Sequence, residues 1–243
     1  MESMHPGTTI DTSRVAKCLK DAGFEPSERQ VELLALHTQA VLERNQTLNL
    51  TRITEVDAVI RLHILDSVTI LPFLAAAPSG DIVDLGAGAG FPGVPLAILQ
   101  DRPVTLVESV KKKAAFLAEV CEELAIPARI VGLRAEELAT REREAYAAVV
   151  ARALASLPAL VELAAPLLKK RGVLIAMKGS PSVEELESGD AAARMCGLKR
   201  GNLVRLKLSG GDEERTIVVY ESVGRPRLKL PRRPGMAQRH PLA

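Results

Sequence analysis

The stretch IVDLGAGAGFPG, residues 82–93, decides how the rest of the chain is interpreted. An apolar run ends in the carboxylate Asp84, a glycine-rich turn follows, and Pro92 suits the first turn of a helix. The glycines Gly86, Gly88 and Gly90 leave room for a ligand and tolerate unusual backbone angles. We therefore predict a strand, a nucleotide-binding loop and a helix over this stretch.

The bulk composition describes a globular chain. Its 243 residues are 47% hydrophobic and 26% charged, enough for one α/β domain with a sizeable addition. No apolar run reaches the roughly 18 residues of a membrane span, so we expect no membrane segment. The cysteines Cys18, Cys121 and Cys196 are too far apart for a zinc motif. We predict no metal, and reduced thiols in a cytoplasmic protein.

The first third of the chain has helical patterns. Residues 11–22 can form a helix, and the sequence after Ser27 has the pattern of a capping box and predicts a second. Thr54 is the expected cap of a third. We interpret residues 1–78 as a helical cap that ends at the Pro-Ser-Gly turn 78–80.

From residue 81 the periodicity changes. Short apolar runs alternate with helical patterns, which is typical of βαβ units and a parallel sheet. The last two runs flank a Ser-Gly-Gly-Asp turn and predict a hairpin. We therefore expect a Rossmann-like α/β domain over residues 79–223. Its expected strands are 82–85, 104–108, 128–131, 146–151, 173–177, 203–208 and 215–222, and its helices are 92–100, 110–124, 156–170 and 182–195.

Two cofactor motifs overlap in the glycine-rich loop. Residues 88–93 match G-x-G-x-x-G, the dinucleotide motif, whereas residues 84–90 match acidic-x-G-x-G-x-G. A strand-end carboxylate is unfavourable beside phosphates, but it suits the ammonium and sulfonium of S-adenosylmethionine, which has no phosphate. Asp84 therefore favours the methyl donor, and a nicotinamide-dependent oxidoreductase remains the alternative.

Further candidates follow the next strands. Glu108 lies 24 residues after Asp84, where a carboxylate can accept both ribose hydroxyls or cap the following helix. The loop 134–137 follows the third strand, and Glu136 there either contacts an adenine or faces solvent. Arg152 follows the fourth strand, at the edge where open α/β sheets bind ligands.

A polar cluster lies on the third helix. His63, Asp66 and Ser67 are spaced i, i+3 and i+4, so they share one helical face. They either line the mouth of the pocket or bridge the cap to the sheet, and we favour the bridge for His63.

The chain ends in a basic segment. Residues 224–243 hold six Arg or Lys and no acidic residue, which leaves 26 basic and 30 acidic residues in the preceding body. The asymmetry indicates a polyanion partner or a solvated end, and it keeps a non-catalytic RNA-binding module among the alternatives.

Taken together and in this order, the motifs resemble the bacterial ribosomal RNA small subunit methyltransferase G family, also called glucose-inhibited division protein B. The resemblance covers roughly residues 27–223, and HILDS at 63–67 combined with GAGFPG at 88–93 is its most specific part. The other matching stretches are NLT at 49–51, RAEE at 134–137, RALASL at 152–157 and MKG at 177–179.

The resemblance implies an S-adenosylmethionine-dependent enzyme that methylates N7 of one guanine in 16S rRNA. It implies a helical cap on a mostly parallel seven-stranded sheet with an antiparallel last strand. It also implies cofactor contacts by Gly86, Phe91, Ala135, Glu136 and Arg152. The expected partner is 16S rRNA or the small ribosomal subunit, and nothing in the sequence requires more than a monomer.

Methyl transfer to guanine N7 needs no acid–base group from the protein. Guanine N7 carries a lone pair and no proton, so it attacks a methyl group without a general base. We expect catalysis to depend on holding N7, the methyl carbon and the sulfur in line. Arg152 and Asp66 are the positioning candidates. Because aromatic residues are few, RNA binding should depend on Arg and Lys contacts, including the basic end, and should weaken with salt.

Overall fold

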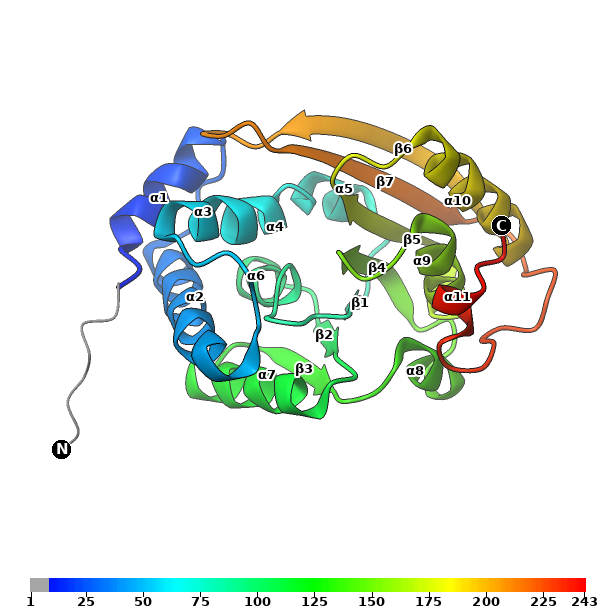
Figure 1. The fold of residues 1–243 in the computed structure, drawn as a ribbon, viewed down its shortest axis with the longest axis horizontal. Coiled ribbons are helices and arrows are strands. Elements are labelled where there is room, and N and C mark those ends of the chain that lie inside the picture. Colours follow the sequence, from blue (N-terminus) through cyan, green and yellow to red (C-terminus); the bar gives the residue numbers. More distant parts are fainter. Residues whose placement is uncertain (1–8) are drawn as a thin grey trace.

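The computed structural model describes residues 9–243 and is built on one seven-stranded sheet (Figure 1). The strand order is β3-β2-β1-β4-β5-β7-β6, and β7 runs antiparallel to both neighbours while β1 to β5 are parallel. The predicted sheet and its terminal hairpin are therefore confirmed. The strands are β1 Ile82–Leu85, β2 Val104–Val107, β3 Ala128–Val131, β4 Tyr146–Arg152, β5 Leu168–Lys178, β6 Leu198–Lys207 and β7 Glu214–Ser222.

Helices cover both faces of the sheet. Because side chains alternate along a strand, Ile82 packs into one hydrophobic core while Val83 and Leu85 pack into the other. The first face is covered by α1 Thr12–Asp21, α2 Glu28–Leu48, α6 Gly93–Leu99 and α7 Lys111–Glu123. The second is covered by α8 Ala135–Arg141, α9 Leu157–Ala164, α10 Val183–Cys196 and α11 Met236–Arg239.

The N-terminal helices share the first core with the sheet, and residues 1–8 of the predicted cap lie outside the described residues. Ser27 caps α2 through the predicted capping box with Gln30. Glu55, and not Thr54, caps the third helical stretch, because its carboxylate reaches two backbone N–H groups. That stretch consists of α3 Val56–Val59, the π-helix η1 Ile60–Leu65, α4 Asp66–Val68 and α5 Leu71–Ala76.

The stretch Val56–Ala76 is long and apolar enough to cross a membrane by length and composition. Over half of its most apolar window is buried inside the protein, however, and Val59, Ile64 and Leu65 are almost fully buried. It therefore packs as a helical stretch of the protein core.

Three element predictions were wrong. The helix expected over 156–170 ends at Ala164, because Pro166 cannot continue it, and β5 begins at Leu168. The segment expected as a loop at 134–137 begins α8, because Glu137 caps the backbone N–H of Arg134. The sixth strand begins at Leu198, since Gly197 ends α10 in the left-handed conformation.

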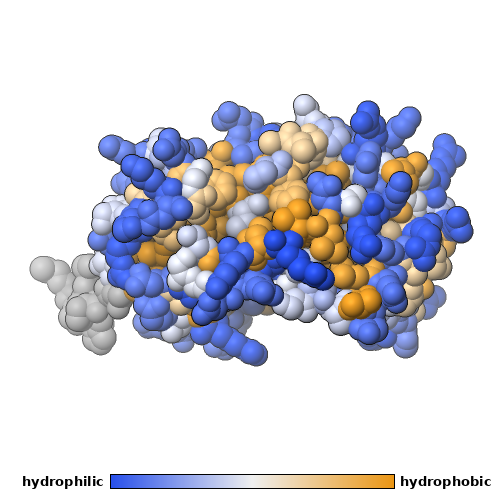
Figure 2. Space-filling model, turned by 90° about the horizontal axis from the view of Figure 1, so that it is seen from above, coloured by the Kyte–Doolittle hydropathy of each residue, from blue (hydrophilic) through white to orange (hydrophobic). Residues whose placement is uncertain are grey.

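Strand β6 forms one edge of the sheet. Figure 2, which looks down on the molecule, shows hydrophobic residues gathered in the middle of the face and hydrophilic ones around its border. The edge strand carries the exposed side chains Lys199, Arg205 and Lys207. Charged side chains at an edge discourage strand pairing between molecules.

Candidate functional site

The glycine-rich loop after β1 is held close to its neighbours. Gly86, Gly88 and Gly90 have φ angles of 74°, 57° and 99°, where side chains are strained. A Cβ on Gly86 would lie 2.6 Å from the Leu154 side chain, and one on Gly90 would lie 2.8 Å from Nε2 of His37. Gly86 and Gly90 therefore let the loop approach Leu154, just after β4, and His37 of α2.

Asp84 is buried at the end of β1. Its Oδ2 accepts the backbone N–H of Gly93 at 2.9 Å, at the start of α6. Its Oδ1 is buried and has no hydrogen-bond partner among the described residues. Burial raises the pKa of Asp84 to about 7, although the Gly93 N–H and Arg152 oppose the shift. A buried, unpartnered carboxylate oxygen is a good acceptor for a cationic group of a ligand.

Glu108 connects the end of β2 to the glycine-rich loop. Its Oε2 accepts the N–H of Gly88 at 3.0 Å, and its Oε1 accepts the N–H of Val110 at 2.7 Å, just before α7. Glu108 therefore makes the contact at the start of the following helix that the sequence allowed, and it also holds the glycine-rich loop. Each carboxylate oxygen has a second lone pair, so Glu108 can still accept from a diol.

A pocket lies between the loop and α8. Its cavity volume is about 50 Å³, and it opens to solvent. Gly86, Val107, Ala135, Leu154 and Gln238 are among the residues that line it.

Glu136 also lines this pocket, but its carboxylate is directed to the C-terminal segment. Its Oε1 accepts the N–H of Gly235 at 2.6 Å, and the side chain is buried. Of the two expected cofactor contacts in this segment, Ala135 lines the pocket, while the carboxylate of Glu136 is hydrogen-bonded to the chain itself.

Phe91 is packed between two histidines behind the loop. The His63 ring stacks on it at 4.8 Å between centroids, and the His37 ring lies tilted at 4.7 Å. Burial lowers the pKa of His37 to about 4 and that of His63 to about 3, so both rings are neutral at pH 7. Phe91 is 4% exposed, and the guanidinium carbon of Arg152 lies 5.7 Å from its ring centroid.

Asp66 holds two arginines in place. Its Oδ2 accepts from Nη1 of Arg152 at 3.0 Å, and its Oδ1 accepts from Nε of Arg215 at 2.8 Å. Arg152 also donates to the carbonyl of Leu62 at 2.8 Å, inside the π-helix. Asp66 is fully buried and both its oxygens are occupied, so it acts through the arginines. The predicted polar cluster thus bridges the cap to the sheet.

Comparison with known proteins decides the family. The family profile described as rRNA small subunit methyltransferase G matches residues 30–218. The chain belongs to the rRNA small subunit methyltransferase G family. A family member from Pelotomaculum thermopropionicum is 37% identical over 227 residues, 92% of this chain and 95% of that protein. One from Limosilactobacillus reuteri is 38% identical over 240 residues, 96% of this chain and all of that protein.

Solved structures agree in fold. A Pyrococcus horikoshii TYW2 structure in complex with MeSAdo has a TM-score of 0.52 at 14% identity, covering 65% of this chain and 62% of that one. A SAM-dependent methyltransferase from Aquifex aeolicus has a TM-score of 0.51 at 14% identity, covering 68% and 93%.

The predicted family, fold, enzyme class and methyl donor are therefore confirmed. This member of the rRNA small subunit methyltransferase G family is an S-adenosylmethionine-dependent enzyme. The two alternatives, a nicotinamide-dependent oxidoreductase and a non-catalytic RNA-binding module, are set aside. Among residues 9–243, no group of three or more His, Cys, Asp or Glu side chains is placed to hold a metal ion.

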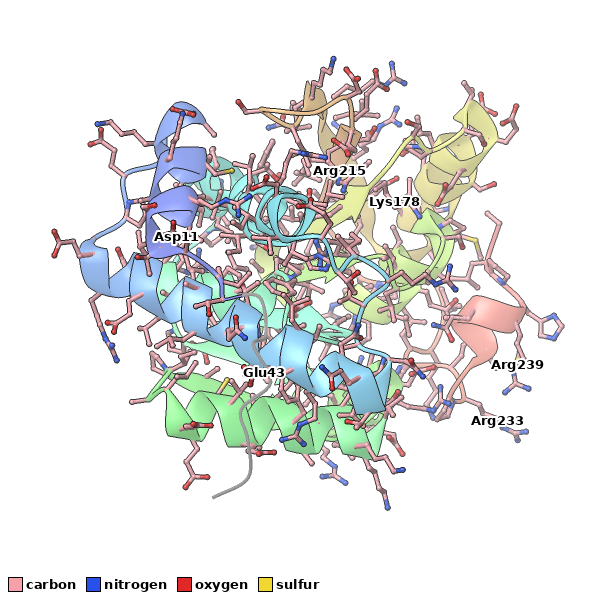
Figure 3. All side chains as sticks on the ribbon, turned by 60° about the vertical axis from the view of Figure 1, so that its left-hand side comes forward. Asp11, Glu43, Lys178, Arg215, Arg233 and Arg239 are labelled. Atoms are coloured by element: carbon pink, nitrogen blue, oxygen red, sulfur yellow. The ribbon has the colours of Figure 1, made fainter. Side chains whose placement is uncertain are left out.

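Three residues of this family member's site escaped the sequence analysis. His37 reaches the loop through the carbonyl of Ala89, 52 residues away, at 3.0 Å. Arg215 reaches Asp66 across 149 residues of chain (Figure 3 labels Arg215 in the upper part of the view). Gln238 lines the pocket from the basic end. No local pattern marks such residues, because their partners are set by strand register and tertiary packing.

Proposed function

We propose that this chain transfers the methyl group of S-adenosylmethionine to N7 of a guanine in 16S rRNA at the carboxyl ends of β1, β2 and β4. The observation that carries the proposal is the buried, unpartnered Oδ1 of Asp84 beside the glycine-rich loop. It gives the methionine end of the cofactor an acceptor for its ammonium group.

The nucleoside end of the cofactor belongs between Glu108 and α8. Glu108 would accept the ribose hydroxyls, and the backbone of Ala135 would contact the adenine. Asp84 and Glu108 are both buried carboxylates at hydrogen-bonding distance from the glycine-rich loop. Two such charges would repel the pyrophosphate of a dinucleotide, whereas they attract the ammonium and sulfonium of the methyl donor.

Arg152 is the positioning residue at the end of β4. Asp66, Leu62 and Phe91 fix its guanidinium, so little side-chain freedom is lost when it meets a ligand. A guanidinium suits the carboxylate of the methionine moiety. With the donor held, the lone pair of guanine N7 attacks the methyl carbon, and the C–S electron pair returns to sulfur to leave S-adenosylhomocysteine. No proton moves in this step.

The RNA surface is the rim of the same sheet edge and the exposed arginines around it. The target guanine must be unpaired to enter a pocket of this kind. Binding to the 16S rRNA or to the small subunit should fall steeply as salt rises, because the contacts are to phosphates. We infer that the working form is a monomer in the cytoplasm, which light scattering and fractionation can test.

The test is a methyl-transfer assay with labelled S-adenosylmethionine, using small-subunit RNA and intact small subunits that lack the modification. The proposal predicts label in a single nucleoside, 7-methylguanosine. Label in another nucleoside, or none with either substrate, contradicts it.

A further inference from the structure

The basic end of the chain is folded onto the second face of the sheet. After β7 it runs past α8 and α9 and ends in α11, which packs against α9 (Figure 1). Leu230 is 4% exposed and Ala237 is 1% exposed, and both belong to the hydrophobic core on that face. Residues 230–240, here termed the C-terminal strap, are therefore part of the packed domain.

Polar contacts fix the strap at Arg232 and at Gly235. Arg232 donates from Nε to Oε1 of Glu162 at 2.6 Å and from Nη2 to the other oxygen, and Glu162 is 3% exposed. The N–H of Gly235 donates to Oε1 of Glu136 at 2.6 Å, in a buried contact. Bidentate and charge-assisted contacts of this kind are among the stronger hydrogen bonds in proteins. Arg232 is thus engaged within the domain and is not part of a free basic surface.

The contact between Glu136 and Gly235 brings the strap to the nucleoside pocket. Gln238, three residues after Gly235, lines the pocket together with Gly86, Val107 and Ala135. Gln238 is exposed, and its carboxamide carries one acceptor oxygen and a donor NH₂ group. These groups match an adenine edge, with its exocyclic amino donor and ring nitrogen acceptors, as in glutamine–adenine pairs in nucleic-acid complexes.

We propose that the C-terminal strap is the outer wall of the nucleoside pocket and that the Gln238 carboxamide recognises the adenine of the cofactor. The inference rests on the proposed function, which places adenosine in this pocket. Glu136 then serves the cofactor indirectly, by holding the strap through Gly235. Arg233 and Arg239 of the strap are exposed at the outer edge of the molecule (Figure 3), where they can contact RNA.

The test is calorimetric titration with S-adenosylhomocysteine and with S-inosylhomocysteine, in which an oxygen replaces the exocyclic amino group of adenine. Wild-type protein should prefer the adenosyl ligand. Gln238→Ala should weaken the binding of S-adenosylhomocysteine about tenfold, because one to two hydrogen bonds are lost. It should also reduce the difference in affinity between the two ligands. Arg239→Gln changes the neighbouring exposed side chain and should leave both titrations unchanged.

Gln238 is exposed, so its variant should keep the fold, which circular dichroism verifies. If Gln238→Ala binds both ligands as the wild type does, the inference is wrong while the proposed function stands. If the wild-type protein binds neither ligand, the proposed function and the inference both fail.

Discussion

Nη1 of Arg152 donates to Oδ2 of Asp66 across 3.0 Å, and this contact ties the end of β4 to the helical layer. Because Arg215 takes the other oxygen of Asp66 at 2.8 Å, one buried carboxylate sets the positions of two arginines at the site. Asp66 is therefore a positioning residue. Its loss should lower the stability of the protein and release the guanidinium of Arg152.

Asp66→Asn should destabilise the protein by about 3 kcal/mol, because it leaves two partly buried guanidinium groups without their anion. Urea denaturation measures the loss. Asp57→Asn is the matched control: Asp57 pairs with Arg14 on the surface, so its loss should cost at most about 1 kcal/mol. If both substitutions lower the free energy of unfolding equally, the buried contacts of Asp66 stabilise the protein no more than a surface ion pair does.

Glu108→Gln should weaken S-adenosylhomocysteine binding roughly tenfold to a hundredfold. The amide keeps one acceptor oxygen but loses the charge, and hydrogen bonds to charged groups contribute about 1.5–3 kcal/mol. Calorimetry gives the affinity. Glu119→Gln, at an exposed carboxylate that pairs with Arg44, should bind as the wild type does. Unchanged affinity in Glu108→Gln would exclude Glu108 as the ribose acceptor.

Cofactor affinity should rise with pH up to neutrality. Burial raises the pKa of Asp84 to about 7 in the protein without cofactor, so below that pH a proton occupies the group that the cofactor ammonium needs. Affinity for S-adenosylhomocysteine should therefore fall by up to about tenfold per pH unit below 7. Asp84→Asn should bind weakly and lack this dependence. If the affinity of the wild type does not change with pH below 7, Asp84 is not the acceptor of the cofactor ammonium.

Three buried groups, His37, His63 and Asp84, determine how the stability of the protein changes with pH. His37 and His63 have pKa values lowered to about 4 and about 3, so the unfolded chain binds their protons first and stability falls as pH drops from 6.5 towards 4. The raised pKa of Asp84 acts in the opposite sense, because the folded protein takes up that proton between pH 7 and 4.

Asp84→Asn should therefore steepen the loss of stability between pH 6 and 5 by about 1.4 kcal/mol per pH unit. Urea midpoints measured across this range for the wild type and the variant provide the test. Parallel curves would mean that Asp84 titrates in the folded protein as it does in the unfolded chain.

Local sequence patterns were sufficient for the first four strands, the last strand and the glycine-rich loop, but not for the starts of β5 and β6. The run before Asp84 alternates between two cores as a buried strand must, and the loop needs its glycines for close approach. Capping at Ser27 was also predictable, because a capping box involves only four adjacent residues. The family resemblance added Phe91 and Ala135 as expected cofactor contacts.

The rest depends on contacts between distant segments. Glu136 lines the pocket, but its carboxylate accepts a hydrogen bond from Gly235, 99 residues later, and no local sequence pattern predicts that partner. Arg215 meets Asp66 only because β7 pairs with β5 in one register. The basic end was interpreted from its charge, whereas Leu230 and Ala237 anchor it by burial.

The most direct test of where the cofactor lies is a crystal structure of the protein with S-adenosylhomocysteine. The account predicts ribose hydroxyls on Glu108, the ammonium within hydrogen-bonding distance of Asp84, and the adenine between Ala135 and Gln238. A ligand bound with its adenine away from α8, or with no contact to Glu108 and Asp84, would contradict it.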